Sequence, residues 1–169
     1  YGEQPNQFIT NQAAAGPAWF VQELVSVTSP NEELANVNEI NTRTTAVMDI
    51  SKFKAPAFQY DSTATIVNLE HTPNYLKYES QSQTTGLSVF SEIYYPAGWI
   101  ATIDGKETPI LRVNYILRAL EIPAGKHTIE FTFKPEPYVI GNKVTAACSW
   151  ILLLVLLGSI GWTLKKDNA

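Results

Sequence analysis

The chain has 169 residues, of which 45% are hydrophobic and 17% are charged, and its formal net charge is −4. This hydrophobic content is too high for a disordered tail, and the acidic balance gives no electrostatic basis for binding nucleic acid. The single cysteine, Cys148, excludes an intramolecular disulfide, and the two histidines have no metal-ligand spacing to each other. We therefore expect neither a metal nor a cofactor. The chain begins with Tyr1 and has no signal segment at its front, so we expect a fragment of a longer protein.

The first third of the chain predicts a connector, two strands and a short helix. Residues 1–17 are rich in Gln, Asn, Ala and Gly and predict the connector. Residues 18–27 and 44–50 alternate as strands do. Between them, residues 29–40 predict a helix, because Ser29 can cap it, Pro30 suits its first position, and Glu32 and Glu33 favour the positive end of its dipole.

From residue 63 onward nearly every segment has the pattern of a β-strand. The expected strands are 63–71, 75–83, 85–95, 99–104, 115–122 and 126–134. Asp104–Gly105 predicts a type I′ hairpin, from which residues 106–111 return, and Pro123–Gly125 predicts another turn. Short strands at this spacing are typical of an antiparallel β-sandwich or a jelly-roll-like pair of layers. We expect the helix at 29–40 to pack at its edge or end.

An uncharged run near the C-terminus predicts one transmembrane helix. Val144–Leu164 contains no charge and would be about 31 Å long as a helix, enough to cross a bilayer. A buried core helix is the alternative, but such helices usually have a polar stripe. Lys165 and Lys166 outnumber Lys143, so the positive-inside rule places the tail, 166–169, in the cytoplasm. The expected organisation is a connector at 1–17, an extracytoplasmic (periplasmic) β-rich domain at 18–142 and an inner-membrane helix at 143–165.

A set of ordered motifs in the second half of the chain resembles a known family. The motifs are the aromatic run Tyr94, Tyr95, Pro96, Gly98 and Trp99, the hairpin Asp104–Lys106, the run Asn114–Ala119, the turn Pro123–His127 and the closing apolar helix. Together they resemble the last extracytoplasmic region of the YfhO family of bacterial membrane proteins. Ala97 is an insertion relative to that pattern. The earlier residues look like Bacteroidetes members, and the resemblance covers residues 15–166.

The resemblance implies a polytopic protein similar to the GT-C class of membrane glycosyltransferases, which use polyprenyl-phosphate sugars. Some members are tied to glycosylation of cell-envelope polymers. The catalytic acidic residues of that class lie in an early extracytoplasmic loop that no part of this chain matches. We therefore expect no catalytic residue and no enzymatic activity in this chain. For the whole protein, one hypothesis is a glycosyltransferase that uses a polyprenyl-phosphate sugar.

Five residues of the β-rich region are candidates for ligand binding: Glu92, Tyr94, Trp99, Arg112 and Arg118. Glu92 is the carboxylate with aromatic neighbours, and Arg118 shares a strand face with apolar residues. A buried arginine needs a partner, so Arg118 predicts either a salt bridge to Glu92 or Glu121 or a site for a phosphate or acidic sugar.

The aromatic run predicts either core packing or a platform on which a sugar ring stacks. Strand alternation places Tyr95 inward together with Ile93 and places Tyr94 on the opposite face. Asp104 is explained by its turn, and Glu130 is expected on the outward face of its strand. No pair of acids or nucleophilic triad stands out.

Three functions remain open from the sequence. The first is an accessory extracytoplasmic domain of a GT-C-like membrane protein that supports glycosylation of a cell-envelope polymer from a lipid-linked sugar. The second is a membrane-anchored glycan-binding module without an enzymatic role, and the third is a free-standing hydrolase, which the absence of an acid pair disfavours. The expected partners are the lipid bilayer through residues 144–164, the rest of the parent protein, and a glycan or lipid-linked sugar, but no nucleic acid.

Overall fold

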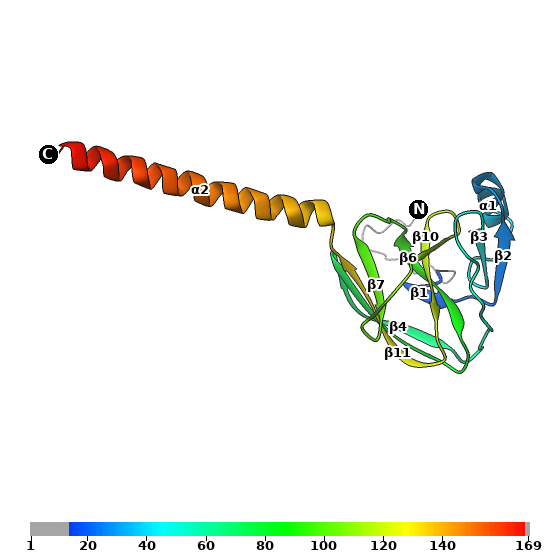
Figure 1. Cartoon of the computed structure of the whole chain (residues 1–169). Coiled ribbons are helices and arrows are strands. Elements are labelled where there is room, and N and C mark those ends of the chain that lie inside the picture. The colour runs from blue at the N-terminus through cyan, green and yellow to red at the C-terminus, as the bar shows by residue number, and fades with distance from the viewer. Residues whose placement is uncertain (1–13, 168–169) are drawn as a thin grey trace, which may run out of the picture.

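The structure, a computed structural model, describes residues 14–167 (Figure 1). Most of the expected connector, residues 1–13, and the last two residues of the expected cytoplasmic tail lie outside this range. The described part consists of a β-rich domain and one long helix, α2, that projects from one side of it. The predicted fold class, mainly antiparallel β with a short helix and a C-terminal apolar helix, is confirmed.

Two antiparallel sheets pack face to face as a sandwich. In one sheet four strands follow the order β1 (Ala18–Phe20), β6 (Gly86–Ile93), β10 (Leu117–Ile122) and β9 (Leu111–Val113). In the other sheet five strands follow the order β4 (Thr65–Thr72), β5 (Tyr75–Ser82), β11 (Gly125–Phe133), β7 (Trp99–Ile103) and β8 (Lys106–Thr108). The chain changes sheets between β8 and β9, at Pro109, where a proline interrupts pairing because it has no N–H to donate.

The main core lies between the two sheets and is built from alternate residues of each strand. On β11, Ile129 and Phe131 are fully buried, as the alternation predicted. Phe131 packs edge-to-face against Phe90 of the other sheet, with ring centroids 4.9 Å apart, and Tyr78 packs against both rings. Edge-to-face packing suits the charge distribution of aromatic rings, so these three residues join the sheets with defined geometry.

A third layer covers the outer face of the four-stranded sheet. It consists of β2 (Glu23–Val27), α1 (Pro30–Val37) and β3 (Thr45–Asp49), with the two strands parallel. Its buried side chains form a second core with those of the sheet, including Val21, Met48, Leu87 and Val89. Figure 1 shows this unit on the side of the domain away from α2.

The expected single strand at 18–27 is two strands in different sheets. Val21 is buried and its N–H still donates to Leu87 of the four-stranded sheet, but the N–H of Gln22 donates to Thr44 instead. The chain therefore leaves the first sheet at residue 21 and begins a new pairing with β3. The parallel β2–β3 pair was not predicted, because it depends on the crossover through α1 and not on local alternation.

The helix α1 begins as predicted and ends three residues early. The Ser29 hydroxyl accepts from the Glu32 N–H at 3.3 Å, and Pro30 opens the helix. After Val37 the Asn38 N–H donates to Ala35, three residues back, which tightens the last turn and stops the helix. The cap and the proline therefore fix the start of α1, whereas its end comes earlier than the composition indicates.

Two turns require left-handed backbone. The predicted hairpin is present, with φ of 51° at Asp104 and 79° at Gly105. A second left-handed pair, Asn114 at 51° and Tyr115 at 71°, separates β9 from β10. Tyr115 is therefore in the turn, and the strand expected to begin at residue 115 begins at Leu117.

The helix α2 runs over Glu136–Asp167 and begins before the expected transmembrane segment, whose first residue was placed at 143. Its apolar part, Ile140–Ser159, has a mean hydropathy of 1.8, and none of these 20 residues is buried in the protein. Twenty helical residues are about 30 Å long, which matches the hydrocarbon core of a bilayer. This is a candidate membrane span.

Candidate functional site

The five candidate residues fall into two clusters on different faces of the four-stranded sheet. Arg112 and Tyr94 both contact Phe53, the first at 5.8 Å from its ring centroid and the second at 5.6 Å between rings. Phe53 packs against the second core, so this cluster belongs to the outer face. Arg118, Trp99 and Glu92 gather instead at the end of the main core, beside the start of α2.

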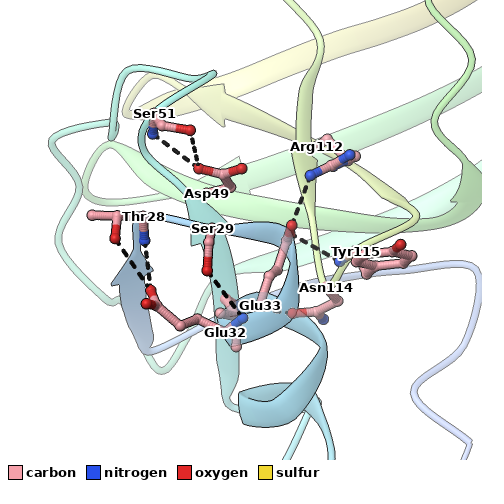
Figure 2. Close-up of polar contacts among 10 residues, drawn as sticks. Thr28, Ser29, Glu32, Glu33, Asp49, Ser51, Arg112, Asn114 and Tyr115 are labelled. Carbon is pink, nitrogen blue, oxygen red and sulfur yellow. Dashed lines mark hydrogen bonds and ion pairs between the residues drawn. The ribbon is translucent and has the colours of Figure 1, made fainter.

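The partner of Arg112 is Glu33 of α1, a fully buried carboxylate (Figure 2). The Arg112 guanidinium donates to Glu33 over 2.7 Å, and the Tyr115 N–H donates to the other Glu33 oxygen over 2.9 Å. The Tyr115 ring also stacks near the guanidinium, at 5.7 Å. These contacts join the helix to the left-handed turn after β9, so Arg112 ties the third layer to the sheet.

Asn114 completes the same junction. The Asn114 N–H donates to the Val47 carbonyl at 2.8 Å. The Asn114 side-chain oxygen accepts from the Val47 N–H, also at 2.8 Å. One residue thus satisfies both backbone groups of a residue in β3, as a neighbouring strand would. The sequence carried one signal for this role, because asparagine is enriched among residues with positive φ.

Arg118 lies between the sheets and is only 3% exposed. Its Nε–H donates to the Ile93 carbonyl at 2.8 Å, and its guanidinium lies 4.2 Å from the centre of the Trp99 ring. Within the described residues no carboxylate forms an ion pair with it, so the expected salt bridge to Glu92 or Glu121 is not made. Burial lowers the pKa of Arg118, and the nearby Glu92 opposes that shift. The face of Trp99 supplies a cation–π contact in place of a carboxylate.

Glu92 links the two sheets through His71 of β4, with 3.8 Å between the carboxylate and the imidazole. The hydroxyl of Tyr78 and the Nη1 of Arg118 are both buried there without a hydrogen-bond partner among the described residues. Burial raises the pKa of Tyr78, which keeps the hydroxyl neutral. The core between the two sheets therefore contains the Arg118 guanidinium and the Tyr78 hydroxyl, each with a hydrogen-bond donor that has no acceptor among the described residues.

The prediction that Tyr95 points inward with Ile93 is wrong. Ile93 is 65% exposed and Tyr95 is 53% exposed, whereas Tyr94 packs against Phe53. The reason is that β6 ends at Ile93, and a bulge between β6 and β10 shifts their pairing from Phe90 onward. Strand alternation cannot be extended past that point.

A groove runs along the edge of the sandwich where the chain crosses from β8 to β9. Three cavities of about 380, 740 and 170 Å³ meet there, and Thr108 lines all of them. We call them together the edge groove. Tyr94 and Trp99 line its smallest cavity, of 170 Å³. Glu107 lines this cavity and the 380 Å³ cavity, whereas Glu121 and Pro123 line the 380 and 740 Å³ cavities. Of the five candidate residues, two therefore line a common cavity.

One end of the edge groove contains an ion pair between His127 and Asp104. The carboxylate lies 2.6 Å from Nδ1, and Nε2 faces the Ala124 carbonyl at 3.1 Å. Because both ring nitrogens face acceptors, the doubly protonated imidazolium satisfies both contacts. The hydrogen bond with Asp104 raises the pKa of His127, and the same bond lowers the pKa of Asp104. Asp104 thus has a role beyond its turn.

A general acid requires a raised pKa, so the lowered pKa of Asp104 argues against that role in the groove. Among the described residues, no three His, Cys, Asp or Glu side chains lie close enough together to hold a metal ion. The groove presents exposed carboxylates, backbone groups and aromatic faces, which can hydrogen-bond to a ligand or stack on it.

Comparison with known protein families matches residues 36–145 to the family described as bacterial membrane protein YfhO. The match begins in α1, covers every strand from β3 to β11 and extends into α2. Neither the curated proteins nor the solved structures gave a match. The matched region is well over half of the chain and includes all the motifs that resembled this family except the closing apolar helix, and the chain therefore belongs to the YfhO family of bacterial membrane proteins.

Proposed function

We propose that the β-rich domain is an accessory extracytoplasmic domain that holds a glycan or a lipid-linked sugar beside the inner membrane. In this proposal the parent protein is a GT-C-like membrane protein that glycosylates a cell-envelope polymer. The observation that carries the proposal is the position of the edge groove, whose aromatic end, at Tyr94 and Trp99, lies where the chain leaves the domain for α2.

The chemistry of the edge groove suits a sugar. Aromatic faces pack on the apolar side of a pyranose ring, and Trp99 is held in place by Arg118 behind it. Carboxylates accept hydrogen bonds from sugar hydroxyls, and Glu107 and Glu121 are exposed along the groove. Lys52 and Lys54 line the largest cavity and supply positive charge for a phosphate.

Binding is tested with the 169-residue chain in lipid nanodiscs, titrated by calorimetry with two probes. These are glucose 1-phosphate and a polyprenyl-phosphate glucose, the second incorporated in the nanodisc. Glu107→Gln and Glu121→Gln each remove one charged acceptor from the groove, and Glu39→Gln makes the same change at an exposed site outside it. We expect the groove variants to weaken binding about tenfold or more, because a hydrogen bond to a charged group contributes about 1.5–3 kcal/mol.

Saturable binding that Glu39→Gln leaves unchanged and the groove variants weaken supports the proposal. No binding of either probe by the intact chain, or equal weakening by all three variants, refutes it. The second candidate is a glycan-binding module without any role in a transferase, for which the one candidate membrane span of the described residues would be a sufficient anchor. It predicts the same binding but no loss of envelope glycosylation when the groove variants are placed in the whole protein.

The orientation is part of the proposal. Residues 1–142 carry nine basic and fifteen acidic residues and would lie in the periplasm, with the tail in the cytoplasm. A tag in the hairpin loop 104–107 of the parent protein should be digested by protease added to intact spheroplasts, while a tag at the tail survives. The reverse pattern would invert the topology and remove the case for an extracytoplasmic glycan.

A further inference from the structure

Three exposed apolar side chains lie together at the end of the domain from which α2 leaves. They are Ile93, Tyr95 and Ile116, and they are 65%, 53% and 50% exposed. The Tyr94 N–H donates to the Ile116 carbonyl at 2.7 Å, so the backbones that carry these side chains run side by side. Single exposed apolar residues are ordinary, whereas a contiguous group marks a surface that contacts something apolar. We call these three residues the apolar end patch.

The loop that carries Tyr95 is fixed to the start of α2. The Lys134 N–H donates to the Gly98 carbonyl at 2.6 Å. Gly98 also packs so closely on Pro135 that an added Cβ would lie 3.0 Å from the Pro135 Cα. On the other side of the loop, Tyr95 and Trp99 both pack near Phe133, the last residue of β11. The apolar end patch therefore keeps a set distance from the membrane span.

That distance is short enough to reach lipid headgroups. The apolar span begins at Ile140, five positions after Pro135, and at a rise of 1.5 Å per helical residue these five steps cover about 8 Å. Tilting the helix only shortens this height above the hydrocarbon. The headgroup layer is about 5–7 Å thick on each side of a bilayer. Tyr138, 72% exposed, lies between the two levels, where tyrosine is favoured.

We propose that the apolar end patch sits in the headgroup layer of the bilayer that α2 crosses and holds the domain against the membrane surface. The partner is phospholipid. The apolar side chains enter the boundary between headgroups and acyl chains, and the exposed Lys134 beside them suits anionic phosphates. The docking is continuous with the transmembrane contact of α2 and does not depend on a glycan in the edge groove.

Spin-label depth measurements on the 169-residue chain test this proposal. Cys148→Ser removes the native thiol, and single labels are then placed at Tyr95→Cys, at Ile116→Cys and at two reference sites. Leu152→Cys lies on the span and reports insertion. Val67→Cys is a matched control, because Val67 is apolar, 57% exposed and five residues from the membrane-side end of β4, about 17 Å away.

The proteins are reconstituted in vesicles of phosphatidylethanolamine and phosphatidylglycerol, and collisions with oxygen and with a water-soluble nickel complex are measured. We expect nickel collisions at residues 95 and 116 to be several-fold fewer than at residue 67, with oxygen collisions more frequent. Equal nickel access at residues 95, 116 and 67 would show that the patch faces water and would overturn the proposal. A label at 95 shielded from both reagents would also overturn it, because that result indicates a protein partner, such as a second copy of the chain.

Discussion

Removal of Arg112 tests whether the third layer depends on a buried ion pair. Glu33 is fully buried and has two donors, the Arg112 guanidinium and the Tyr115 N–H. Arg112→Met keeps a long side chain against Phe53 but leaves the carboxylate with one neutral donor. Breaking a buried pair by removing one partner costs about 3–5 kcal/mol, so we expect a loss of that size in the free energy of unfolding.

Two further variants separate the charge from the packing. Glu33→Gln keeps an oxygen for the Tyr115 N–H but presents an amide donor to the guanidinium, and we expect a loss of about 1.5–3 kcal/mol. When Glu33→Gln is combined with Arg112→Met, the amide no longer faces a guanidinium and no buried carboxylate is left unpaired. The double variant should therefore be more stable than Arg112→Met alone. Lys126→Met is the matched control, because the Lys126–Glu79 pair at 3.0 Å is exposed and should contribute at most about 1 kcal/mol.

The measurement is denaturant unfolding of the chain in detergent micelles, followed by near-ultraviolet circular dichroism. The signal reports the packed aromatic residues of the β-domain, and the slope with denaturant shows whether the unfolding unit is unchanged. If Arg112→Met lost no more stability than Lys126→Met, the pair would not hold the third layer. A double variant less stable than Arg112→Met would contradict the reasoning about the uncompensated charge.

Three further predictions concern the turns. Gly98→Ala should destabilise the domain more than Gly105→Ala in the same unfolding assay, because both have positive φ but only Gly98 would force a Cβ against Pro135; equal losses would mean that the contact is soft. The native protein should be more stable than the His127→Gln variant, with the full difference below pH 6.5 and none once the pH has risen through the raised pKa of His127. A stability difference that grows with pH would contradict the ion pair with Asp104. The Gln83 N–H and Thr63 lower the pKa of Asp61 to about 2, so the disadvantage of Asp61→Asn should be full above pH 3.8 and disappear as the pH falls through about 2; a disadvantage independent of pH would indicate a role for shape alone.

Local signals accounted for most elements of the fold. The alternation of β11, the hairpin at Asp104 and the capped start of α1 are each decided by residues within a few positions of one another. The predictions failed where a distant contact decides. The chain leaves the first sheet after Val21 because Thr44 accepts the N–H of Gln22, and nothing in the local pattern indicates that partner.

The candidate residues show the same division. Arg112 was a candidate residue, but its partner Glu33 lies 79 positions away in the sequence. The position of Glu33 in the first turn of α1 indicated only a favourable interaction with the helix dipole. Arg118 was correctly expected among apolar residues, yet an aromatic face replaces the expected carboxylate. Tyr95 was assigned to the wrong face, because the bulge in β6–β10 pairing lies just before it.

The edge groove and the apolar end patch share Tyr95, and this overlap limits what the groove could bind. Tyr95 lines the smallest cavity together with Trp99 and also belongs to the patch that we place at the headgroups. A lipid-linked sugar keeps its phosphate in the headgroup layer, so its sugar would reach this cavity directly. A soluble glycan has no such anchor, so the position of the cavity at the membrane surface does not strengthen its binding. Tyr95→Ser should therefore weaken binding of a membrane-embedded polyprenyl-phosphate glucose more than binding of glucose 1-phosphate in water. Equal weakening of both probes would mean that Tyr95 acts only as a wall of the groove and that the membrane does not help to present the ligand.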